Sequence, residues 1–96
     1  MMNYFQLYPL LTAELRFHVT DNDLSKDQSQ YLLNRSLEEN PDLAPEIVRS
    51  FEDPEFSWME ILIHPDVGEV YEAETEEEAR EFAAEMFLKP AVSGHV

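Results

Sequence analysis

Residues 57–74, SWMEILIHPDVGEVYEAE, decide the predicted fold class. Two apolar runs, about 57–64 and 69–74, flank the tetrapeptide Pro-Asp-Val-Gly, whose composition is typical of a turn. Gly68 can adopt the positive φ that such a turn requires, because it has no Cβ. The stretch therefore predicts two antiparallel strands joined as a β-hairpin.

A third strand is predicted in TAELRFHVT, residues 12–20, because apolar and polar side chains alternate along it. Its apolar face would carry Ala13, Leu15, Phe17 and Val19. The preceding residues 3–11 are apolar but have no regular period, and Pro9 would interrupt a central strand. An edge strand, a short helix and a packed arm all remain open for this segment.

Two helices are expected in the middle of the chain. Ser25, followed three residues later by Gln28, forms a capping-box signature for a helix that runs to about Asn40. After Pro41 a shorter helix is expected, and the two would form a hairpin. Its apolar residues at helical spacing are Leu43, Ile47, Val48 and Phe51.

Thr75 and Glu78 repeat the capping signature and predict a last helix that runs to about Leu88. The Lys-Pro pair that follows should end this helix, so residues 90–96 are expected to form a flexible tail. The order β-α-α-β-β-α then predicts one α+β domain over residues 1–89. In this domain, helices would pack on an antiparallel sheet of about three strands.

The composition narrows the classes of function. The 96 residues include no Cys and two Gly, and the three His share no ligand spacing, so we expect neither a metal site nor a cofactor. No nucleophile elbow, phosphate-binding glycine loop or dinucleotide fingerprint is present, so we expect that the protein is not an enzyme. No window is long and apolar enough for a membrane span, and residues 1–17 do not resemble a signal peptide. A cytoplasmic location is expected.

The net charge is the strongest signal. With 21 Asp and Glu against 6 Lys and Arg, the formal net charge is −15. This charge would repel nucleic acid and anionic lipid, so we expect no direct nucleic-acid or membrane partner. It would attract basic surfaces, which belong most often to proteins that bind nucleic acid.

The acidic residues are densest in VYEAETEEEAREF, residues 70–82. Glutamates in the first turn of the predicted helix interact favourably with its dipole, each by about 0.3–1 kcal/mol. Folding does not explain like charges four residues apart, which destabilise a helix. Such carboxylates stand about 6 Å apart on a helix, and alternate residues such as Glu72 and Glu74 on the preceding predicted strand stand about 6.5–7 Å apart. Both separations are comparable with that of neighbouring phosphates in nucleic acid. The residues interpreted as substitute phosphates are Glu72, Glu74, Glu77, Glu81 and Glu85.

In size and acidity the chain resembles the small proteins with which phages and mobile elements block host defences, among them anti-CRISPR and anti-restriction proteins. The resemblance rests on these two properties and on no particular residue. It implies a non-enzymatic inhibitor that occupies the basic nucleic-acid-binding surface of a host protein complex by mimicking phosphate charge.

The alternative is a small regulatory or accessory domain that docks through an apolar face and is acidic only for solubility. In the predicted hairpin, Trp58, Glu60 and Leu62 lie on the side opposite the core. An outward Trp58 and Leu62 ringed by acidic residues would form an interaction hot spot. A strand covered on both faces is the competing interpretation. A homodimer is one form that such docking could take.

Overall fold

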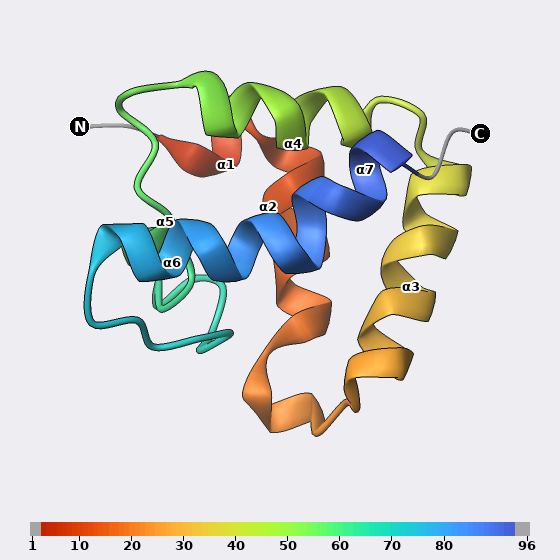
Figure 1. Cartoon of the computed structure of the whole chain (residues 1–96), viewed down its shortest axis with the longest axis horizontal. Helices are drawn as coiled ribbons and strands as arrows, with labels where there is room; N and C mark the ends of the chain where they lie inside the picture. The colour runs from red at the N-terminus through yellow and green to blue at the C-terminus, as the bar shows by residue number, and fades with distance from the viewer. Residues whose placement is uncertain (1–2, 94–96) are drawn as a thin grey trace.

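The computed structural model describes residues 3–93, and every regular element within them is a helix (Figure 1). The elements are α1 Tyr4–Leu7, α2 Pro9–Leu15, the 3₁₀-helices η1 Arg16–His18 and η2 Thr20–Asn22, α3 Lys26–Glu39, α4 Leu43–Glu52, α5 Trp58–Ile61, α6 Glu76–Ala83, the π-helix η3 Ala84–Leu88 and α7 Lys89–Ser93. The predicted α+β fold with a three-stranded antiparallel sheet is therefore wrong, because the described chain is all-helical.

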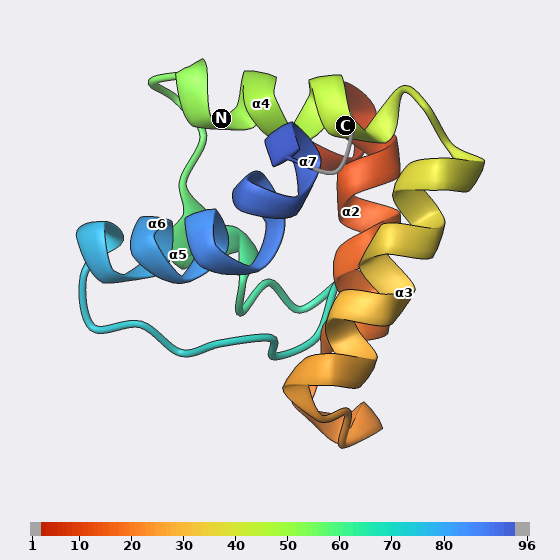
Figure 2. The same ribbon diagram turned by 45° about the vertical axis from the view of Figure 1, so that its right-hand side comes forward.

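The helices α6, η3 and α7 follow one another without a break and run below α4 in Figure 1. α5 packs against α6, and α7 packs against α4. α3 and α4 are joined by a short turn, and α3 runs at a steep angle to α4 in both views (Figures 1 and 2). The two helices therefore do not lie side by side as the expected hairpin. Buried side chains from all these helices join in one hydrophobic core.

The strand predicted in residues 12–20 is instead the end of α2 followed by η1 and η2. Its supposed apolar face does not exist, because Phe17 is 56% exposed and Ala13 is also exposed, whereas Leu15 is fully buried. Five buried positions repeat at alternating steps of four and three residues, which is helical spacing. They are Tyr4, Tyr8, Leu11, Leu15 and His18, and Thr12 and Glu14 are buried beside them in the sequence. Pro9, at the first position of α2, suits this helix because it needs no N–H there.

The predicted hairpin is also absent. α5 replaces its first strand, and residues 69–74 form no regular element. The segments still touch, since the backbone N–H of Val70 donates to the carbonyl of Leu62 at 2.7 Å, but no ladder develops. Gly68 has the predicted positive φ, at 107°. A Cβ at Gly68 would stand 2.8 Å from Cγ1 of Val19, so the turn is held close to the segment between η1 and η2.

Both predicted capping signatures lie at helix starts. Ser25 and Gln28 form a complete capping box at the start of α3. Thr75 caps α6 by accepting a hydrogen bond from the backbone N–H of Glu78 at 3.0 Å. α4 begins at Leu43, as expected from the apolar spacing that follows Pro41.

The C-terminal end differs from the prediction because the helix does not stop at Pro90. The residues before it form the π-helix η3, in which the wider turn accommodates the missing N–H of a following proline. The chain then continues as α7, with Ala91 2% exposed. Residues 90–93 are therefore helical rather than a flexible tail, and the rest of the predicted tail, 94–96, lies outside the described residues.

Candidate functional site: the acidic surface of α6

One glutamate of the acidic run holds the fold together. Glu76 is half-buried, and its carboxylate accepts hydrogen bonds from Ser57 Oγ at 2.6 Å and from the backbone N–H groups of Trp58 at 2.8 Å and Met59 at 3.2 Å. These N–H groups open α5 and have no partner within that helix. Glu76 therefore caps a helix that lies 18 residues earlier in the sequence.

Glu78 has a second structural role. Its carboxylate accepts hydrogen bonds from the backbone N–H of Glu74 at 2.6 Å and from the hydroxyl of Tyr71 at 3.1 Å. The hydrogen bond to Glu78 is the main reason that the pKa of Tyr71 is raised. These contacts attach the segment before α6 to its first turn.

The five residues interpreted as substitute phosphates are all exposed. Glu85 differs from the other four because its charge is neutralised in a 2.6 Å ion pair with Lys89. The hydrogen bond in this pair lowers the pKa of Glu85. Within residues 3–93, none of Glu72, Glu74, Glu77 and Glu81 takes part in an ion pair. These four form what we call the acidic surface.

Two residues of the acidic surface border a shallow hollow of about 510 Å³ between α4 and α6. Its lining consists of Phe51, Glu77, Arg80, Glu81 and Ala84. Arg80 is held within this lining, since it donates to the carbonyl of Phe51 at 3.0 Å and lies over the Phe51 ring at 5.3 Å. The hollow thus combines an aromatic wall with two exposed carboxylates and has a net formal charge of −1.

Arg16 and Arg49 are held in the same way as Arg80. Three guanidinium groups each donate to a backbone carbonyl of a distant segment and lie over an aromatic ring. They are Arg16 with Asp66 and Phe5, Arg49 with Leu7 and Tyr8, and Arg80 with Phe51. Within the described part of the chain none of the three pairs with a carboxylate, so they leave the acidic surface unneutralised by direct contact.

The apolar docking face expected around Trp58 does not exist on the surface. Trp58 and Leu62 are both 0% exposed, and the Trp58 ring packs against Phe51, Phe56 and Phe87. Trp58, expected in an interaction hot spot, is thus a core residue. Ser57 followed by Glu60 is itself a capping signature, and it could have indicated the helix that turns Trp58 inward.

Glu60 is exposed, as expected for a partner-binding residue, but its side chain also makes a contact within the protein. Its carboxylate accepts a hydrogen bond from the hydroxyl of Tyr4 at 3.1 Å. Glu60 lies on α5 and does not line the hollow between α4 and α6.

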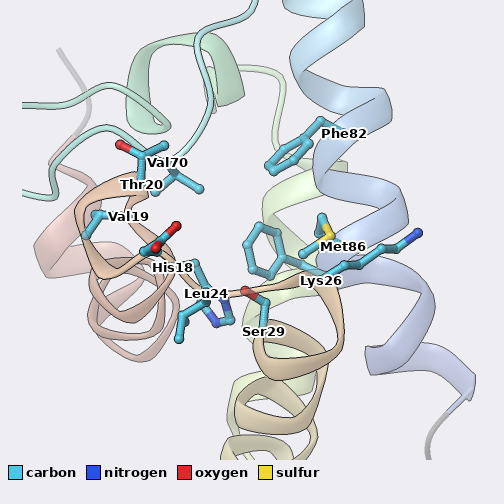
Figure 3. Close-up of a pocket in the computed structure, with 11 residues that line it drawn as sticks. His18, Val19, Thr20, Leu24, Lys26, Ser29, Val70, Phe82 and Met86 are labelled. Carbon is cyan, nitrogen blue, oxygen red and sulfur yellow. The ribbon is translucent and has the colours of Figure 1, made fainter.

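Sequence reasoning also missed a cavity next to His18 (Figure 3). His18 Nε2 lies 2.6 Å from Oε2 of Glu14, and both side chains are almost fully buried. The spacing of four residues between a Glu and a His is a helical signal that was concealed by the strand interpretation of this segment.

In comparisons with known proteins, no family model, no curated protein and no solved structure matches the chain. None of the helices within residues 3–93 combines the length and hydrophobicity needed to cross a membrane. In the same part of the chain, no group of three or more His, Asp or Glu side chains is arranged to hold a metal ion.

Proposed function

We propose that this protein binds a Lys- and Arg-rich protein surface through the acidic surface Glu72, Glu74, Glu77 and Glu81, and that it occupies a surface that otherwise binds nucleic acid. The observation that carries the proposal is the hollow bordered by Glu77 and Glu81. The two exposed carboxylates of this hollow can meet the charged end of a partner's lysine or arginine.

Local charge supports this assignment. Residues 66–85 contain nine Asp and Glu and one Arg, so about a fifth of the chain carries more than half of its net negative charge. Glu76 and Glu78 are used in capping and in fixing the preceding segment, and Glu85 is paired. The carboxylates that remain on this surface can exchange their counterions for the cationic groups of a partner, as nucleic-acid phosphates do.

The first test uses a fluorescent Lys/Arg-rich peptide as a defined probe, with fluorescence anisotropy measured at rising NaCl concentrations. Glu77→Gln with Glu81→Gln removes two exposed contacts worth about 0.5–1 kcal/mol each, so the double variant should bind roughly five- to thirty-fold more weakly. Its affinity should also fall less steeply with salt.

The matched control is Glu38→Gln with Asp42→Asn, which changes the net charge equally. These exposed residues lie at the α3–α4 turn, on the other side of the molecule from the start of α6 (Figures 1 and 2). Equal weakening in both double variants would show that only net charge matters and would refute the assigned surface.

A second experiment tests occupation of a nucleic-acid site. The protein is immobilised, basic proteins are captured from a bacterial lysate treated with nuclease, and duplex DNA is then added. The proposal requires that DNA displaces the captured proteins and that the Glu77/Glu81 double variant captures less of them than the control. Proteins that stay bound in the presence of DNA would contradict mimicry.

A further inference from the structure

Outside the acidic surface, a cavity of about 500 Å³ lies next to His18. This volume falls within the roughly 300–1,000 Å³ that is typical of small-molecule sites. Three parts of the chain form its walls: the η1–η2 region with the start of α3, the loop at Val70, and the helix from α6 into η3 (Figure 3).

The cavity walls are mainly apolar. The apolar lining residues are Val19, Leu24, Val70, Phe82, Met86 and Phe87. Figure 3 shows Phe82 and Met86 on one side, facing Val19 and Val70 on the other. Asp23 and Lys26 also line the cavity, but both are exposed and their formal charges cancel, so the lining does not select a charged ligand.

His18 supplies a buried polar group to this apolar lining. Its Nε2 faces the Glu14 carboxylate, which accepts hydrogen bonds, so this nitrogen carries a hydrogen. Nδ1, the other ring nitrogen, is buried and has no hydrogen-bond partner within residues 3–93. A buried polar atom without a partner is costly, and such atoms are rare in folded proteins. A ligand whose hydroxyl reaches Nδ1 would therefore gain a hydrogen bond that the described residues do not supply.

The π-helix gives the wall its shape. η3 places Met86 and Phe87 in the lining, and the Phe87 ring meets the His18 ring edge to face at 5.4 Å. Single π-turns occur frequently at functional sites. Met86 is half-buried, and its flexible thioether can adjust to ligands of different shape.

We propose that this cavity binds a small aromatic molecule that carries one hydroxyl group, and that the hydroxyl forms a hydrogen bond with Nδ1 of His18. A hydroxyl both donates and accepts, so it satisfies Nδ1 whether the ring is neutral or protonated. The aromatic part replaces water against Phe82, Met86 and Phe87. This site is separate from the acidic surface, so neither proposal depends on the other.

The test compares p-cresol with toluene, which has nearly the same shape but no hydroxyl. Protein with ¹³C-labelled methionine methyl groups is titrated and followed by NMR. We expect saturable shifts of the Met86 methyl group, with the Met59 methyl group, outside the lining, as the internal control. Toluene should bind at least about fivefold more weakly, because it cannot form the hydrogen bond.

A second readout needs no substitution. The Nδ1 resonance of His18 in a long-range ¹H–¹⁵N spectrum should move with p-cresol and stay in place with toluene. A Met86 methyl group that does not respond, equal affinities for the two probes, or an unchanged Nδ1 resonance would each overturn the proposal.

A cavity-filling variant tests the location. Met86→Trp should abolish the p-cresol response at His18, whereas Met59→Trp, a half-buried methionine outside the lining, should retain it. Retained binding in a folded Met86→Trp protein would place the ligand elsewhere and refute the site.

Discussion

The carboxylate of Glu76 accepts a hydrogen bond from the backbone N–H of Trp58 at 2.8 Å, and so links the first turn of α6 to the first turn of α5. This contact explains part of the acidic run in structural terms. The same sequence of three glutamates contains Glu77, which is exposed and borders the hollow assigned to a partner. Adjacent residues of one type therefore have separable roles.

Glu76→Ala and Glu77→Ala form a matched pair, because both remove one negative charge from the first turn of α6. Loss of Glu76 leaves the opening N–H groups of α5 without their cap, so we expect a destabilisation of about 1.5–3 kcal/mol. Glu77→Ala should change the free energy of unfolding by less than about 0.5 kcal/mol. Urea unfolding measures the change in the free energy of unfolding for each variant. Equal destabilisation by the two substitutions would show that only the interaction with the helix dipole matters.

Glu46 should be a second long-range cap. It is 7% exposed, and its Oε1 accepts hydrogen bonds from the backbone N–H groups of Leu10 at 3.1 Å and Leu11 at 3.0 Å, at the start of α2. Glu46→Ala should destabilise the protein by about 2–3 kcal/mol in urea unfolding. Glu38→Ala, at an exposed position, is the control, and a similar loss there would contradict the capping role.

Trp58 should behave as a core residue in fluorescence. It is the only tryptophan, so the emission spectrum reports on this site alone. The buried indole should emit at shorter wavelength than N-acetyltryptophanamide and resist acrylamide quenching, and both properties should disappear in urea. Quenching of the native protein as strong as that of the free compound would contradict the all-helical packing around Trp58.

Stability should fall at high pH because of Tyr4. Burial raises the pKa of Tyr4 to about 12 from its ordinary value of 10.0, with a further contribution from Glu60. The unfolded chain therefore loses this proton first, so the stabilisation is complete below about pH 10 and is lost as the pH rises toward about 12. Urea midpoints measured across this range should fall less steeply for Tyr4→Phe. Tyr8, whose pKa is also raised by burial, is present in both proteins, so parallel curves would rule out Tyr4 as the cause.

Gly68 should not tolerate a side chain. Its φ of 107° alone should make Gly68→Ala destabilising by about 1–3 kcal/mol. The added Cβ would also meet Cγ1 of Val19 at 2.8 Å. In a Val19→Ala background the same substitution should therefore cost less, and a double-mutant cycle measures the difference. Equal costs in the two backgrounds would show that the backbone angle acts alone.

The sequence alone determines the net charge. It also predicts the N-caps of α3 and α6, the start of α4 and the positive φ of Gly68. Each depends on composition or on residues within a few positions of one another. Ser25 and Gln28, for example, satisfy each other's backbone groups wherever α3 packs. The exposure of Glu77 and Glu81 also agrees with their interpretation as surface charges.

Tertiary structure decided the fold class and the environment of the remaining site residues. A short apolar run such as residues 57–64 is compatible with both a strand and a helix. The choice there depends on Glu76, which is 18 residues from the N–H group of Trp58 that it caps. Likewise, α2 receives its cap from Glu46, 36 residues after Leu10. The local sequence pattern cannot reveal such contacts. The packing of distant segments decides which N–H groups a buried carboxylate accepts hydrogen bonds from.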